Sequence, residues 1–321
     1  MRRRGLLAAA CGWVLASGGQ AQTTWPTRPI TLIVPFAPAG IADITARTVA
    51  QAMARELGQP IVVDNRPGAG SVIASSAVAR AAPDGYTLLL MSNANAVSTA
   101  LFRKLPFDVV KAFAPITTLG FFDLGVFVAS DSRFRSLKDV VAYASANPGR
   151  LTIASISVGS TQHLAAELFK TKAGIDALIV PYKGTPAVLT ALRTGEVEVA
   201  FEILGPMLPQ LSAKAIQVVA VTSDRRYAGL PQVPTVMEAG VPDYAVASWN
   251  ALAAPAGTPP AVIARLNRVA AEALAQPAVQ QRLLELGVRT QSGSPQQLES
   301  LLASEIERWG RVIRAAKIEP E

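Results

Sequence analysis

A serine nucleophile is the first chemistry that the residues suggest. Residues 155–159 read Ser-Ile-Ser-Val-Gly, one residue short of the Gly-x-Ser-x-Gly turn that presents the nucleophile of α/β-hydrolases. The only histidine, His163, lies on the helix that this turn would begin, whereas in those hydrolases the histidine follows the acid late in the chain. The spacing therefore disfavours a serine hydrolase, and we expect His163 to be a helix residue that faces a cleft or the core.

Thiol, metal and cofactor chemistry have equally little support. The only cysteine, Cys11, lies in a segment that we expect to be removed, and a single histidine is too few for a typical zinc site. Residues 68–74 imitate a dinucleotide-binding turn, but the next strand ends in Ser92-Asn93 without the acidic residue that such sites use. We therefore expect no metal, no cofactor and no enzymatic activity, with an exported hydrolase kept as the disfavoured alternative.

The sequence instead offers backbone N–H groups that can hold an anion. Residues 30–34 form an apolar run typical of a buried strand, the turn 35–40 ends it, and apolar residues every four positions predict a helix to about residue 57. The first N–H groups of a helix lack intrahelical partners and attract anions. Gly159-Ser160-Thr161 begins a later helix in the same way, although an ordinary helix cap would have this sequence too.

Three charged side chains near these turns could either contact a ligand or have an ordinary structural role. Asp43 falls in the first turn of its helix, where a carboxylate stabilises the helix dipole without contacting any ligand. Lys183 and Glu202 follow predicted strands, so each could face a crevice or be a solvated surface charge. No pair of carboxylates is spaced for acid–base catalysis.

The elements that would position these residues alternate between strands and helices. Strands at 30–34, 61–64 and 87–91 are separated by helical segments, and a second series places strands at 151–154, 178–181, 197–201 and 216–221. This alternation predicts an α/β fold with two doubly wound, mainly parallel sheets whose ligands gather at the carboxyl ends of strands. Short strands at 125–129 and 247–254 are expected to cross between the two halves as hinges. Three helices are expected between residues 259 and 313, the second ended by Gly287 and the third capped by Ser294.

Composition and the amino-terminal segment indicate a globular protein that is exported from the cytoplasm. Half of the 321 residues are hydrophobic and 17% are charged, which is typical of a globular chain with a sizeable core. Residues 1–21 combine Arg2–Arg4, an apolar centre and a small-residue end, as a signal peptide does; a membrane anchor would need about 20 apolar residues. A twin-arginine export route and a lipoprotein site at Cys11 stay open as alternatives. Without those three arginines the net charge falls from +7 to +4, and no dense basic stripe predicts nucleic-acid binding.

Several motifs resemble those of one known family, the solute-binding receptors of tripartite tricarboxylate transporters, also called Bug receptors. The matching segments lie along the whole mature chain in order: residues 34–40 with Asp43 and 46–47, 65–70, 83–88, 159–164, 180–184, 220–223, 230–235 and 254–259. The resemblance implies a two-lobed periplasmic binding protein of type II (a Venus flytrap). We expect residues 22–126 and 251–321 to form one lobe and residues 127–250 to form the other. It also implies a small carboxylate or related polar solute as ligand, delivered to membrane permease subunits or reported to a sensor kinase, and a monomeric receptor.

The same resemblance implies where the ligand lies. In the family, ligand oxygens are held by the first strand-to-helix loop and by the Gly-Ser loop of the second lobe, which are residues 36–43 and 157–161 here. Two departures concern the ligand: Ala39 and Ile41 replace glycines, and Glu202 stands where an aspartate is common. The complete set of expected ligand-binding residues is Phe36, Ala37, Ala39, Gly40, Asp43, Ser92, Asn93, Ser157, Gly159, Ser160, Thr161, His163, Tyr182, Lys183, Glu202 and Trp249.

Overall fold

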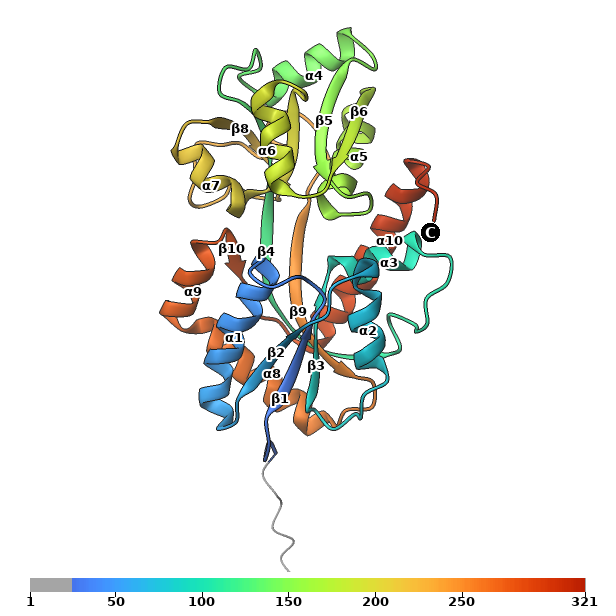
Figure 1. The fold of residues 1–321 in the computed structure, drawn as a ribbon, viewed down its shortest axis with the longest axis vertical. Helices are drawn as coiled ribbons and strands as arrows, with labels where there is room; N and C mark the ends of the chain where they lie inside the picture. Colours follow the sequence, from blue (N-terminus) through green and yellow to red (C-terminus); the bar gives the residue numbers. More distant parts are fainter. Residues whose placement is uncertain (1–24, 321) are drawn as a thin grey trace, which may run out of the picture.

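The computed structural model describes residues 25–320, and the predicted signal segment 1–21 lies outside the described residues. Figure 1 shows two lobes stacked along the longest axis of the molecule. Two long strands, β4 (Phe113–Ala129) and β9 (Ala247–Pro255), run between them. The chain therefore has the two-lobed α/β architecture that the sequence predicted.

The first lobe is built on three parallel strands with helices around them. Strand β1 lies between β2 and β3, and β9 then pairs antiparallel with β3. The elements are β1 (Ile30–Val34), α1 (Ile41–Leu57), β2 (Ile61–Asn65), the short 3₁₀ helix η1 (Ala69–Ser71), α2 (Val72–Ala79), β3 (Thr87–Ser92), α3 (Asn93–Leu101), α8 (Pro260–Ala275), α9 (Pro277–Leu284), β10 (Val288–Thr290) and α10 (Pro295–Ala315).

The second lobe repeats the arrangement on a smaller scale. Strand β5 pairs in parallel with β6 and with β7, while β8 pairs antiparallel with β4. The elements are α4 (Leu137–Ala146), β5 (Leu151–Ile156), α5 (Thr161–Ala173), β6 (Ala177–Tyr182), α6 (Thr185–Thr194), β7 (Val199–Ile203), α7 (Leu204–Ser212) and β8 (Ile216–Val221).

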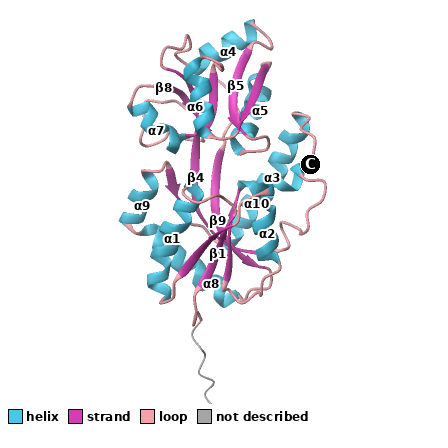
Figure 2. Ribbon diagram, viewed as in Figure 1, coloured by secondary structure: helices cyan, strands magenta, loops and turns pink. Residues whose placement is uncertain are grey.

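Strand β4 belongs to both sheets. It pairs with β9 from Phe113 to Asp123 and with β7 from Leu124 to Phe127, so its partner changes between Asp123 and Leu124. Figure 2 shows β4 and β9 as the two strands that run from one lobe into the other. The change of partner lies close to the predicted lobe limit at residue 126, and the exact limits of the two lobes stay a prediction.

Apolar cores fill each lobe and also continue between them. Leu32, Met53 and Leu266 are buried in the first lobe, where α1 and α8 cover one face of the sheet. A different cluster spans both lobes and includes Trp309 of α10 together with Phe169 of α5. Burying one such side chain contributes about 1.5–3 kcal/mol. Among residues 25–320, no helix has an apolar stretch long enough to cross a membrane.

Candidate functional site

A cavity of about 270 Å³ lies between the lobes. Sixteen residues line it, contributed by both lobes and by the crossing strands. They are Phe36, Gly40, Ile41, Ala42, Ser92, Ala94, Val97, Phe122, Ile156, Gly159, Ser160, Thr161, Gln162, Ile203, Ser248 and Asn250.

The amino terminus of α1 forms one wall of this cavity. Gly40 is the N-cap residue of α1. Because glycine has no side chain, the N-cap residue accepts no hydrogen bond from the first N–H groups of the helix through a side chain. Asp43 holds the turn before the helix: its carboxylate accepts hydrogen bonds from the Ala39 N–H at 2.9 Å, Arg47 Nε at 3.0 Å and Asn65 Nδ2 at 2.9 Å. Burial alone would raise the pKa of Asp43, but these hydrogen bonds and the charge of Arg47 together hold it below its ordinary value. Asp43 therefore supports the turn as a carboxylate instead of lining the cavity.

The amino terminus of α3 forms a second wall. Ser92 is its N-cap, and Ser92 Oγ accepts a hydrogen bond from the Ala94 N–H at 3.3 Å. The next residue, Asn93, is buried and points away from the cavity: its Oδ1 accepts from Trp309 Nε1 at 2.7 Å, and its Nδ2 donates to Thr161 Oγ1 at 2.9 Å. This last bond joins the first lobe to the second.

The amino terminus of α5 closes the cavity from the second lobe. Ser160 is the N-cap, and its Oγ accepts from the His163 N–H at 3.1 Å. The N–H groups of Thr161 and Gln162 precede the first intrahelical bond, and no acceptor in residues 25–320 receives them. Gly159 has a φ of +78°, and a Cβ there would lie 2.5 Å from Cδ2 of Leu101 in the first lobe. Glycine thus allows the loop to approach α3.

The cavity attracts anions through dipoles, since none of its sixteen lining residues carries a charged side chain. Three helix amino termini, from both lobes, meet at it, and each contributes about half a positive elementary charge. Phe36, Ile41, Phe122, Ile156 and Ile203 make the remaining walls apolar. The arrangement can hold a compact negative group joined to an apolar body.

Six of the residues expected from the sequence line the cavity, and their contacts with a ligand stay a prediction. They are Phe36, Gly40, Ser92, Gly159, Ser160 and Thr161. The other ten lie beside the cavity or away from it: Ala37, Ala39, Asp43, Asn93, Ser157, His163, Tyr182, Lys183, Glu202 and Trp249.

The two remaining aromatic candidates point elsewhere. Trp249 is 1% exposed and packs in the core, because residues on either side of it in β9 take the opposite face of the strand. Tyr182 donates its hydroxyl hydrogen to Glu196 at 2.8 Å. Burial, and after it this pairing with Glu196, raises the pKa of Tyr182 to about 12. Neither residue lines the central cavity.

The loop residues outside the cavity are mostly exposed. Ala37, Ala39, Ser157 and Lys183 all face solvent, because they stand at the outer side of the turns that present the helix termini. Lys183 is exposed, and its contact with a ligand stays a prediction.

Two buried titratable residues lie behind the cavity wall. Glu202 is fully buried and accepts hydrogen bonds from Gln162, Thr185 and the Ile203 N–H; burial raises its pKa. His163 is 6% exposed, and burial followed by the charge of Lys170 lowers its pKa. No group of three or more His, Cys, Asp or Glu side chains gathers as a metal site in the described part of the chain.

Sequence reasoning missed Gln162, Ser248 and Asn250, which supply three further polar side chains of the wall. Strand alternation carries a signal for two of them: since Trp249 faces the core, Ser248 and Asn250 must face the other side. Thr161 Oγ1 lies 3.4 Å from Ser248 Oγ, so α5 and β9 are linked at the wall of the cavity.

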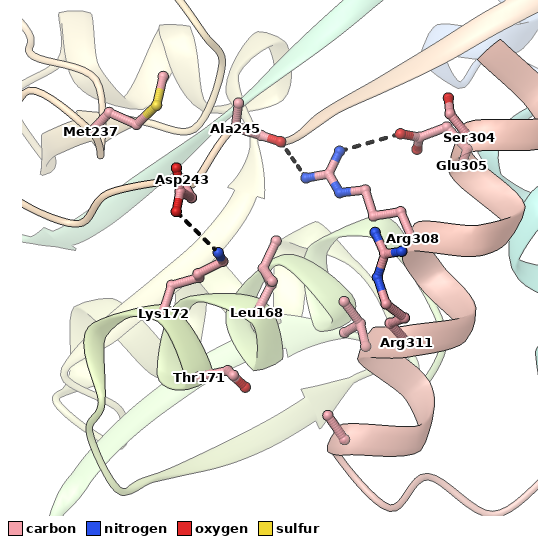
Figure 3. A pocket seen from close by; sticks show the side chains of 12 residues that line it. Leu168, Thr171, Lys172, Met237, Asp243, Ala245, Ser304, Glu305, Arg308 and Arg311 are labelled. Carbon is pink, nitrogen blue, oxygen red and sulfur yellow. Dashed lines mark hydrogen bonds and ion pairs between the residues drawn. The ribbon is translucent and has the colours of Figure 1, made fainter. Parts of the chain in front are cut away.

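A larger hollow of about 630 Å³ lies between α5 and α10 (Figure 3). Its charged groups are already paired: Lys172 with Asp243 at 3.7 Å, and Arg308 with Glu305 at 3.2 Å. Arg308 also donates to the Ala245 carbonyl oxygen. Each of these two ion pairs lies within one lobe, whereas the bond from Arg308 to Ala245 joins α10 to the segment before β9.

Comparison with known proteins agrees with this geometry. Residues 45–318 match the model of a family described as "Tripartite tricarboxylate transporter family receptor". The chain is 36% identical over 314 residues to "Protein BugT" of Bordetella pertussis, a match that covers 96% of each chain.

Two solved structures with bound carboxylates are also similar. "R. palustris Rpa4515 with adipate" has a TM-score of 0.82 and 36% identity, and the match covers 92% of this chain and 100% of that one. MatC (Rpa3494) from Rhodopseudomonas palustris, with bound malate, has a TM-score of 0.77 and 33% identity, over 90% of this chain and 100% of that one.

Proposed function

Because the chain belongs to the tripartite tricarboxylate transporter receptor family, we propose that it captures a small carboxylate in the cavity between its lobes and delivers it to a membrane permease. The observation that carries this proposal is the meeting of three helix amino termini, from α1, α3 and α5, at one uncharged cavity. N–H groups without acceptors favour an anion there, and no side chain on the wall is arranged to make or break a bond.

The walls indicate what kind of carboxylate fits. Charge-assisted hydrogen bonds contribute about 1.5–3 kcal/mol each, whereas association costs about 4–15 kcal/mol. A micromolar Kd needs about 8 kcal/mol net, so four anion contacts fall short. The apolar wall around Phe36 and Phe122 must supply the rest, which favours a carboxylate with an aliphatic or aromatic body.

Compartment and partners follow from the same family membership. We propose that the protein works in the periplasm as a monomer after removal of residues 1–21. Delivery to permease subunits is the principal proposal, and signalling through a sensor kinase is the alternative. Genes for one large and one small permease subunit beside its own gene would favour transport.

The experiment is a calorimetric titration of the protein with carboxylates and their uncharged amides. Adipate, malate and benzoate are each compared with the matching amide, and we expect at least one acid to bind with micromolar Kd while its amide does not bind. If no acid shifts the melting temperature or produces heat of binding, the proposal fails.

A proline variant tests the role of the helix terminus. Ile41 is the first residue of α1, where proline fits the backbone because Gly40 before it is extended (φ −78°, ψ 167°). Ile41→Pro removes one N–H from the cavity, and Ile41→Val keeps it. We expect about a tenfold or larger loss of affinity in Ile41→Pro alone; equal affinities in the two variants would contradict the proposed anion site.

A further inference from the structure

Two side-chain amide groups at the cavity, those of Gln162 and Asn250, indicate a property of the ligand that the helix amino termini do not. The direction of the Gln162 amide depends on Glu202. Glu202, at the end of β7, is fully buried and makes no ion pair with the described residues. Its Oε1 receives the Ile203 N–H at 2.8 Å and Gln162 Nε2 at 2.7 Å, and its Oε2 receives Thr185 Oγ1 at 3.0 Å. Glu202 thus fixes the direction of the Gln162 side chain.

The direction of Gln162 follows from donor and acceptor chemistry. Glu202 Oε1 already accepts from the Ile203 N–H, which can only donate, so the Gln162 atom beside it is the amide nitrogen. The amide oxygen, Gln162 Oε1, then accepts no hydrogen bond from residues 25–320 and is not among the atoms that the protein fully encloses. Since Gln162 lines the cavity, this oxygen is an open acceptor there.

Asn250 provides a second, independent acceptor in the same cavity. Its Nδ2 donates to the Trp249 carbonyl oxygen at 3.1 Å, while Asn250 Oδ1 is buried without a hydrogen-bond partner. Asn250 is 2% exposed and lines the cavity from β9. An enclosed acceptor without a donor costs free energy that a bound donor recovers.

We propose that the ligand is a carboxylate that also carries a hydrogen-bond donor, a hydroxyl or an N–H group, which binds the amide oxygens of Gln162 and Asn250. This inference rests on the proposed function and narrows its ligand class. A carboxylate ion can only accept hydrogen bonds, so it satisfies the helix termini but leaves both amide oxygens unpaired. Glu202 acts as a positioning residue, because it determines which end of the Gln162 amide faces the ligand.

Matched ligand pairs test the donor requirement. Calorimetric Kd values are measured for succinate with malate, adipate with 2-hydroxyadipate, and benzoate with 4-hydroxybenzoate. We expect the hydroxylated member of at least one pair to bind about tenfold more tightly or better, as one recovered hydrogen bond allows. If both members of every binding pair agree within about threefold, the inference fails while the proposed function stands; if no acid of any pair binds, both fail.

Variants of Gln162 and Glu202 identify the source of the preference for the hydroxylated ligand. Gln162→Met keeps the volume but removes the acceptor, and we expect the preference within the pair to fall to about threefold or less. Glu202→Met releases the amide and should weaken the preference too. Glu202→Gln is the matched control: its amide oxygen can still accept from both Ile203 and Gln162, so the preference should persist. The ratio of two Kd values is insensitive to a general loss of stability, and an unchanged ratio in Gln162→Met would overturn the inference.

Discussion

Ala39 adopts a backbone conformation that favours glycine. Its φ is +67°, in the left-handed region, where a Cβ costs about 1–2 kcal/mol. The turn nevertheless stays in place because Asp43 accepts a hydrogen bond from the Ala39 N–H. We expect Ala39→Gly to stabilise the protein by up to about 1 kcal/mol, after the entropic cost of glycine is subtracted, as measured by urea denaturation.

Ala37 provides the control for this change. It is exposed in the same loop, and it is not among the described residues with positive φ. Ala37→Gly should therefore lower the free energy of unfolding slightly or leave it unchanged. A gain in Ala37→Gly as large as that in Ala39→Gly would show that relief of strain is not the cause.

Asp43 links the stability of this turn to pH. Its pKa is lowered in the folded protein, so the folded state binds fewer protons than the unfolded state between the two pKa values. The stabilisation is complete above the unfolded value of about 3.9 and is lost as the pH falls through the lower, folded value. We expect Asp43→Asn to cost about 1–3 kcal/mol at pH 7, and the gap to wild type to narrow in denaturation experiments at pH 3 and below.

Asp64 is the matched control for Asp43. Its ion pair with Arg66 is exposed on both sides, with side-chain exposures of 37% and 44%. Exposed pairs contribute about 0–1 kcal/mol, so Asp64→Asn should have little effect at any pH. A pH-independent loss in Asp43→Asn would mean that packing, and not the charge, is what the substitution removes.

At the level of residues, the sequence predicted which turns reach the cavity better than it predicted the side chains around them. Gly40 and Ser160 follow from turn chemistry and Phe36 from the family resemblance, and all three line the cavity. The directions of Asn93 and Trp249 depend on partners far away in the sequence, such as Trp309 for Asn93. No local pattern contains that information, so their burial could not be predicted.

At the level of elements, regular apolar strands were easy to predict and interrupted ones were not. The predicted strand at 30–34 and the predicted helix that ends near residue 57 match β1 and α1. The prediction at 125–129 covered only the end of β4, because Pro115, Gly120 and Gly125 break its apolar pattern. Helix α3 was missed since Asn93 and Asn95 are typical turn residues; here each makes buried hydrogen bonds instead.

The contact between the α5 loop and α3 yields a prediction about how the lobes meet. A Cβ on Gly159 would lie 2.5 Å from Leu101 Cδ2, so Gly159→Ala should hinder the approach of the second lobe to the first. We expect ligand affinity to fall about three- to tenfold, measured by calorimetry. Strain at the φ of +78° adds a loss of stability, which thermal unfolding reports separately.

A double-mutant cycle separates the contact from the strain. Leu101→Ala removes the atom that the new Cβ meets, so the double variant should regain part of the lost affinity even though Leu101→Ala alone weakens the core. If the two effects on affinity simply add, the Gly159–Leu101 contact does not control the approach of the lobes.

For the whole molecule, the two lobes are covalently joined by β4 and β9 and held together by contacts on either side of the cavity. On one side, the shared cluster of α5 and α10 joins their cores. On the other side, α7 of the second lobe touches the turn between α9 and β10 in the first. The cavity lies between these contacts, so ligand binding and lobe position are expected to depend on each other.

Gly205 is the residue through which this dependence can be tested. It lies in α7 without a positive φ, and a Cβ there would lie 2.0 Å from the Leu286 carbonyl oxygen, a backbone atom that cannot turn aside. Gly205→Ala should favour the helix itself by up to about 1 kcal/mol. It should nevertheless force α7 away from the first lobe, and with it the wall that Ile203 contributes to the cavity.

We therefore expect Gly205→Ala to bind carboxylate about tenfold more weakly and to show a smaller ligand-induced decrease in the radius of gyration by small-angle X-ray scattering. Ser212→Ala, at the exposed end of the same helix, is the control and should resemble wild type in both measurements. Because the added methyl group improves the helix and harms only the contact between lobes, weaker binding without a loss of thermal stability would locate the effect at that contact. An unchanged affinity together with an unchanged decrease in radius would mean that the lobes do not need this approach to hold the ligand.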